Sequence, residues 1–148
     1  RLGNIKLEDP TDLSRFLGCN HHQCSDTGEQ SLAFEMAEYI DQAVAKYEAL
    51  AGSRPLKKVS TPFLPEGSLP ECDDEVRGEL AAKACGVLMK DLYAARLSRP
   101  DLLKPITELS KSVTKWSRNH DRQLWRLMCY MKTTRNFQLE GPGSFHHV

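Results

Sequence analysis

One short stretch carries the residue types that a metal site requires. Cys19 to Cys24 reads CNHHQC, and thiolate and imidazole are the preferred ligands of zinc. On an extended strand, however, Cys19 and His21 face one side while His22 and Cys24 face the other, so the four cannot close a tetrahedron without a turn. We therefore assign no metal ligands, and a zinc-stabilised hairpin is the weakest of three hypotheses.

A second stretch, CDDE at Cys72 to Glu75, clusters the carboxylates that two-metal chemistry uses. It lies in a proline-rich segment without a partner carboxylate on a flanking strand, so a solvated acidic turn is the better interpretation. The chain also has no GxSxG, HExxH or glycine-rich phosphate-loop motif. We predict no catalytic residue in this chain.

Basic residues are concentrated near the C-terminus. Between Arg96 and Asn136 ten Lys and Arg stand against three acids, so this segment is +7 and the remainder is −7, although the whole chain is neutral. Such a segment is typical of a polyanion partner, and a solvated helix face gives the same count. The predicted phosphate-contacting residues are Lys111, Lys115, Arg118, Arg122 and Arg126.

The N-terminal half predicts a hairpin, one helix and a loop. RFLGCNHH and QSLAFEM are strand-like and are separated by the turn residues of QCSDTGE. Between Ala37 and Ala51, apolar residues recur at helical spacing until Gly52 ends the pattern. Residues 53–75 carry four prolines without periodicity, which predicts a long loop that is draped over the surface or mobile.

The second half predicts three helices and a tail. The first covers Val76 to about Ala95, and Pro100 is suited to the first turn of the second, whose apolar stripe runs from Leu102 to Trp116. Asn119 is the predicted N-cap of the third, Asp121 to about Thr134. Trp116 and Trp125 lie at apolar helical spacing and are expected in the core. A short strand and a loose tail follow in residues 137–148.

These elements predict an α+β fold that is mostly helical, with an N-terminal β-hairpin, about four helices and a short C-terminal strand. The length suits one domain, divided here into residues 1–52, 53–75, 76–136 and 137–148. Five cysteines without regular spacing, and no signal-like or membrane-spanning segment, lead us to expect an intracellular protein without membrane contact.

Several stretches together resemble one known family. DLSRFLGCN, FEMAEYIDQAV, VSTPFLPEG and GVLMKDLYAARLSRPDLLKPITELSKSVTKWSRNHDRQLWRLMCYMKTT look, in this order, like the C-terminal part of a copia-type retrotransposon reverse transcriptase. The resemblance covers about Asp12 to Asn136. No single motif is decisive, but six in order with plausible spacing are far more specific than any one.

The matching residues fall into six groups along the chain. They are Phe16, Leu17 and Gly18; Tyr39 and Ile40; Thr61 and Pro62; Gly86 and Leu88; Arg99, Pro100 and Asp101; and Leu109, Ser110, His120, Arg126, Tyr130, Lys132 and Thr134. The sequence departs from the family at Met36, Ser98, Asp121, Met131 and Thr133. The resemblance implies structural roles for Phe16, Gly18, Arg99, Pro100, Asp101, His120 and Tyr130.

The resemblance implies that the chain is the thumb and connection part of an RNA-directed DNA polymerase. The polymerase Asp-Asp strand would lie upstream of Arg1 and the ribonuclease H carboxylates downstream of Val148. The expected partners are an RNA/DNA template–primer duplex and the rest of the parent polyprotein. Mg²⁺ is expected for the parent polymerase and no cofactor for this chain. The rival hypothesis is a small helical protein-interaction module without a nucleic-acid role.

Overall fold

The computed structural model describes residues 9, 14–26, 29–52 and 54–142, and it contains one antiparallel sheet and a group of helices. The strands are β1 (Arg15–Phe16), β2 (Cys19–Asp26), β3 (Glu29–Glu35) and β4 (Leu139–Pro142), and they pair in the order β1-β2-β3-β4. The predicted hairpin and the short C-terminal strand are therefore confirmed. The tail beyond Pro142 lies outside the described residues.

The turns differ from the expected ones. Gln23 to Asp26, expected in a turn, belong to β2, since Gln23 pairs with Leu32 and Asp26 with Glu29. The turn between β1 and β2 lies at Leu17 and Gly18. Both residues have a positive φ, a conformation that glycine adopts without strain. Residues 27–28 of the predicted turn lie outside the described residues.

Four α-helices form the body of the molecule. They are α1 (Ala37–Ala51), α2 (Ala84–Leu97), α3 (Leu103–Ser110) and α4 (Arg118–Thr133), with short 3₁₀ turns at Glu71–Asp73, Pro100–Leu102 and Val113–Lys115. Helix α1 has the predicted bounds, and it buries the predicted stripe of Ile40, Val44 and Tyr47. The predicted fold class, α+β and mostly helical, is confirmed.

Helix α2 begins eight residues later than predicted. Residues 76–83 instead form a bridge and turns: Arg77 pairs with Ser117, and Arg118 donates its backbone N–H to the carbonyl oxygen of Val76. The tertiary pairing satisfies backbone groups that a helix would have used. Gly86 of α2 is exposed, and a Cβ added to it would meet no atom within 4 Å.

The last two helices also differ at their ends. Helix α3 stops at Ser110, and Trp116 is extended rather than helical. Pro105 is the third residue of α3, so its missing N–H falls among the groups that lack an intrahelical partner anyway. The N-cap of α4 is Ser117, whereas Asn119, the predicted cap, lies inside the helix with its side chain buried.

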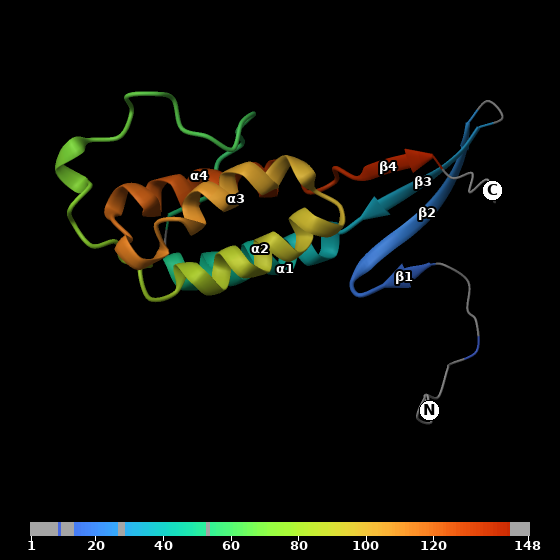
Figure 1. The fold of residues 1–148 in the computed structure, drawn as a ribbon, viewed down its shortest axis with the longest axis horizontal. Coiled ribbons are helices and arrows are strands. Elements are labelled where there is room, and N and C mark those ends of the chain that lie inside the picture. Colours follow the sequence, from blue (N-terminus) through green and yellow to red (C-terminus); the bar gives the residue numbers. More distant parts are fainter. Residues whose placement is uncertain (1–8, 10–13, 27–28, 53, 143–148) are drawn as a thin grey trace, which may run out of the picture.

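The core lies between the four helices, with α1 and α2 side by side and α3 and α4 across from them (Figure 1). Leu88, Ile106, Leu124, Met128 and Met131 are fully buried there. Both tryptophans belong to this core as predicted. The sheet extends beyond one end of the helices (Figure 1). None of the helices in the described part of the chain is long and apolar enough to cross a membrane.

Candidate nucleic-acid interface

The predicted basic residues of α4 contact the loop at residues 54–75, called here the proline-rich loop. The Arg122 guanidinium lies 2.6 Å from a carboxylate oxygen of Asp73, and the Arg118 guanidinium lies 4.0 Å from the other oxygen. Asn119, between them, donates from its side-chain amide to the carbonyl oxygen of Pro70 at 2.8 Å and to the Asp74 carboxylate at 2.5 Å. These contacts fasten the loop to the first turns of α4.

Arg126 continues the same row one turn later. Its guanidinium donates to the backbone carbonyl of Thr61 at 2.9 Å and to the Thr61 hydroxyl at 3.0 Å. Farther along α4, the Thr133 hydroxyl accepts a hydrogen bond from the backbone N–H of Val59 at 3.1 Å. The proline-rich loop therefore runs antiparallel to α4. Of the two arrangements expected for it, draped over the surface or mobile, the structure shows the draped one.

Lys111 and Lys115 lie beside α3, outside this row. Lys111 pairs with Glu108 at 2.8 Å on the surface, a contact that contributes little to stability. Lys115 is exposed and has no ion pair among the described residues; it lines a hollow of about 520 Å³ with Arg77 and Ser117. Of the five predicted residues, Lys111, Lys115 and Arg118 thus keep exposed charge, while Arg122 and Arg126 are held by the loop.

The Arg99-Pro100-Asp101 segment between α2 and α3 forms a hydrogen-bond network with the end of α4, in which Arg99 is buried and Asp101 is exposed. Arg99, 1% exposed, donates to both carboxylate oxygens of Asp101 at 3.0 and 2.8 Å. The same guanidinium donates to the carbonyl oxygen and hydroxyl of Thr134 at 2.8 and 2.7 Å. Tyr130 donates its hydroxyl to Asp101 at 2.8 Å. These four residues, the hinge network, join the α2–α3 connection to the C-terminus of α4.

The network favours the ionised carboxylate of Asp101 and the neutral hydroxyl of Tyr130. Burial by itself would raise the pKa of Asp101, but hydrogen bonds from Arg99 and Tyr130 and the Arg99 charge outweigh burial and lower that pKa. Burial raises the pKa of Tyr130, and its hydrogen bond to Asp101 raises it further. Arg99 and Asp101, predicted to have structural roles, contact each other and the end of α4. Pro100 opens the 3₁₀ turn between them, as its fixed φ allows.

His120 forms the N-terminal cap of α4 together with Ser117. The Ser117 backbone N–H donates to His120 Nδ1 at 3.0 Å, and the Ser117 hydroxyl lies 2.8 Å from the same nitrogen. Because Nδ1 accepts, the ring proton resides on Nε2 when the ring is neutral. Burial lowers the pKa of His120, against the opposing charges of Asp74 and Asp121, and so favours this neutral form.

The Asp121 carboxylate binds three donors. Its carboxylate accepts from Trp116 Nε1 at 2.7 Å and from the backbone N–H groups of Glu79 and Leu80 at 2.6 and 3.3 Å. A Cβ on Gly78 would meet the Ser117 carbonyl oxygen at 2.6 Å. Asp121 and Gly78 together hold residues 76–80 against the start of α4.

Phe16 and Gly18 lie at the opposite end of the molecule. Phe16 is 64% exposed in β1, and Gly18 occupies a left-handed conformation in the turn that follows. The carbonyl oxygen of Leu17 accepts a hydrogen bond from the Tyr93 hydroxyl at 2.6 Å, which attaches this turn to α2. These residues therefore position the sheet and do not approach the basic row on α4.

The side chains of the cysteine and histidine cluster are divided between the two faces of the hairpin. His21 and Phe34 are cross-strand partners in edge contact, while His22 pairs with Ala33 on the opposite face of β2 and β3. Burial raises the pKa of the Cys19 thiol and disfavours the thiolate. Within residues 9, 14–26, 29–52 and 54–142, no three His, Cys, Asp or Glu side chains are grouped to hold an ion.

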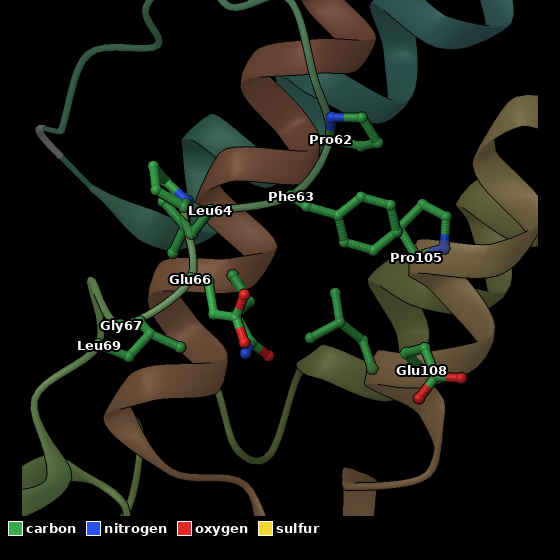
Figure 2. A pocket seen from close by; sticks show the side chains of 11 residues that line it. Pro62, Phe63, Leu64, Glu66, Gly67, Leu69, Pro105 and Glu108 are labelled. Carbon is green, nitrogen blue, oxygen red and sulfur yellow. The ribbon is translucent and has the colours of Figure 1, made fainter.

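The clearest apolar cavity lies under the proline-rich loop and has a volume of about 360 Å³ (Figure 2). Phe63 of the loop projects toward Pro105 of α3, and Leu109 contributes to the lining. Glu66 and Glu108 are its carboxylates. Sequence reasoning missed this cavity because the loop residues and the α3 residues that line it lie about 40 residues apart in the sequence. They come together only when the loop packs on α4.

Sequence reasoning also missed the side chains that fasten the loop. Asp73 was treated as part of a solvated acidic turn, yet it is 9% exposed and paired with Arg122. The sequence did contain one signal for this contact: the acidic CDDE stretch and the Arg-x-x-x-Arg spacing of Arg118 and Arg122 carry opposite charge in a neutral chain. That signal identifies opposite charges but not which of them meet.

Comparisons with known proteins do not assign the chain to a family: no family model matches it, and neither the curated proteins nor the solved structures contain a significant match.

Proposed function

We propose that the chain is the thumb and connection part of a copia-type retrotransposon reverse transcriptase, where it grips a template–primer duplex and carries no active site of its own. The partners are an RNA/DNA duplex and the remaining parts of the parent polyprotein. Mg²⁺ belongs to the parent polymerase. Lys111, Lys115 and Arg118 are the leading phosphate contacts, since their charged ends are exposed.

The observation that carries this proposal is that residues of separate motifs contact each other. Arg99 and Asp101 come from one motif and Tyr130 and Thr134 from another, and all four meet in the hinge network. Thr61 and Arg126, again from two motifs, are hydrogen-bonded. Motifs that meet in space are expected of one inherited architecture, and chance matches scattered along a chain have no reason to do so.

The test is a salt titration of binding to a labelled RNA/DNA primer–template duplex, followed by fluorescence anisotropy. With three phosphate contacts we expect a log–log slope of affinity against salt of about −3, because each contact contributes roughly −0.9. Replacing Lys115 or Arg118 with Ala should reduce the magnitude of the slope by about one each. Arg122 is unsuitable for this purpose, because its loss would also release the proline-rich loop.

Lys46, an exposed lysine on α1, supplies the matched control, and its replacement by Ala should leave the slope unchanged. Unchanged binding by the Lys115→Ala and Arg118→Ala variants would refute the proposed interface. A wild-type affinity that does not respond to salt would refute it as well.

The second candidate is the small helical interaction module, and the cavity of Figure 2 favours it. A largely apolar hollow of about 360 Å³ has the size of pockets that receive small ligands or single side chains. In addition, several basic side chains serve internal contacts, including Arg99, Arg122 and Arg126. This candidate predicts that neither Lys115→Ala nor Arg118→Ala affects duplex binding.

A further inference from the structure

Arginine side chains from two parts of the chain surround a hollow between α1 and α4. The hollow has a volume of about 210 Å³, and its lining includes Arg54, Arg118, Arg122 and the ring of Trp125. Arg54 follows α1 in the proline-rich loop, and the other three residues belong to the first half of α4. Three arginine side chains thus line one concave surface.

Two of these guanidinium groups have donors to spare. Arg122 is held from both sides, because Nη1 donates to the Asn119 side-chain oxygen at 2.8 Å and Nη2 lies 2.6 Å from Asp73. Arg118 is only within 4.0 Å of Asp73. Arg54 stacks over the Trp125 ring at 3.8 Å from its centroid and has no hydrogen bond or ion pair with any described residue. Arg54 and Arg118 are therefore free to donate.

The tryptophan beneath Arg54 lacks an acceptor. Trp125 is 7% exposed, and its Nε1 is buried without a hydrogen-bond partner among the described residues. An indole N–H is only a donor, and leaving it unpaired costs about 1–3 kcal/mol. Because this nitrogen has almost no accessible surface, Trp125 offers the hollow its ring, over which Arg54 lies, and not its N–H.

Two carboxylates also line the hollow, and they do not satisfy these donors. Asp121 already accepts from Trp116 Nε1 and from the backbone N–H groups of Glu79 and Leu80. The Glu79 side chain is exposed and has no ion pair within the described part of the chain. Donors thus exceed available acceptors at this surface, although Glu79 repels an incoming anion.

We infer that this hollow binds a phosphate-class oxyanion, which accepts hydrogen bonds from Arg54 and Arg118. Guanidinium groups suit such a ligand, because their planar donors match two oxygens of one phosphate. The site shares Arg118 and Arg122 with the proposed duplex interface but stands on its own geometry. The phosphate belongs either to a nucleic-acid backbone or to a free anion.

The test is a titration of the whole chain with inorganic phosphate at constant ionic strength, followed by phosphorus NMR. Loss of one charged donor in Arg54→Ala should weaken binding by roughly tenfold or more. Trp125→Phe keeps a ring beneath Arg54 and should change binding little, because only the inaccessible N–H is removed. Glu79→Gln should tighten binding, because it removes a repelling charge while keeping the shape. Lys46→Ala, on α1 outside the hollow, should have no effect.

Arg54 is exposed, so its variant keeps the site testable even if Trp125→Phe loses stability in a thermal melt run alongside. Absence of phosphate binding by the wild-type chain overturns the inference. Equal binding by the wild-type and Arg54→Ala chains overturns it as well.

A competition experiment then separates the two sources of phosphate. If phosphate displaces the duplex from the wild type, and Arg54→Ala weakens both ligands, the occupant is a backbone phosphate. If phosphate binds without displacing the duplex, the occupant is a free anion, and both results support the site. Failure of the Lys115→Ala and Arg118→Ala duplex test, with phosphate binding intact, refutes the proposed function alone.

Discussion

Asp91 is a fully buried carboxylic acid without a hydrogen-bond partner among the described residues. Burial raises its pKa from 3.8 to about 7, with Lys90 opposing the shift. The folded chain therefore holds a proton that the unfolded chain has lost between these pH values. The contribution of Asp91 to the free energy of unfolding is therefore fully present below pH 3.8, and it is lost as the pH rises through about 7.

Replacing Asp91 with Asn should stabilise the fold at pH 8 by roughly 1–3 kcal/mol, because the buried charge disappears while an unpaired polar group stays. Urea unfolding at pH 5 and pH 8 measures the effect, and the benefit should shrink at the lower pH. Asp101→Asn provides the opposite control: the pKa of Asp101 is lowered, so its loss should destabilise at pH 8. A gain that is equal at both pH values would contradict the prediction.

The bounds of a helix were predicted correctly where its apolar face alone determines them. Helix α1 has a clean apolar stripe and an uninterrupted composition, so its bounds follow from the sequence. The starts of helices α2 and α4 depend on tertiary contacts, since the Gly78 N–H donates to the carbonyl oxygen of Trp116 and the Glu79 N–H donates to Asp121 there. Helical periodicity cannot reveal such pairing, because the partners lie about 40 residues apart.

Two glycines in neighbouring segments test this contact between elements. Gly78→Ala places a Cβ at 2.6 Å from a backbone oxygen and should cost about 1–3 kcal/mol, because backbone must move. Gly86→Ala, in α2 with no atom within 4 Å, should instead stabilise by up to about 1 kcal/mol. Thermal unfolding followed by circular dichroism compares the two. Similar effects of both substitutions would show that the predicted contact is absent.

At the scale of the whole molecule, α4 and the proline-rich loop form one unit. Replacing Arg126 with Ala removes both hydrogen bonds to Thr61, and we expect protease cleavage in the loop to accelerate several-fold. Lys111→Ala, which breaks only a surface pair with Glu108, is the control and should not change the cleavage rate. Limited proteolysis at native pH, with fragments mapped by mass spectrometry, measures both.

The candidate site shows the same limit of sequence reasoning. Charge counting located the basic segment, and Lys111, Lys115 and Arg118 do present exposed charge. The charge count did not separate these three residues from Arg122 and Arg126, which are also basic but bind the loop. Arg54 stayed outside every predicted set, because a single arginine in a loop carries no pattern until Trp125 lies beneath it.

The antiparallel course of the loop along α4 has a consequence for changes in chain length. Thr61 and Pro70 are attached to Arg126 and Asn119, while Glu66 to Ser68 between them are exposed. Extra residues at Gly67 would lengthen only the free span and leave both attachments in place. One residue added between Arg122 and Arg126 would rotate the following turns by about 100° and detach Thr61, Val59 and the hinge network together. Length variants of this protein should therefore differ in the loop and agree in α4.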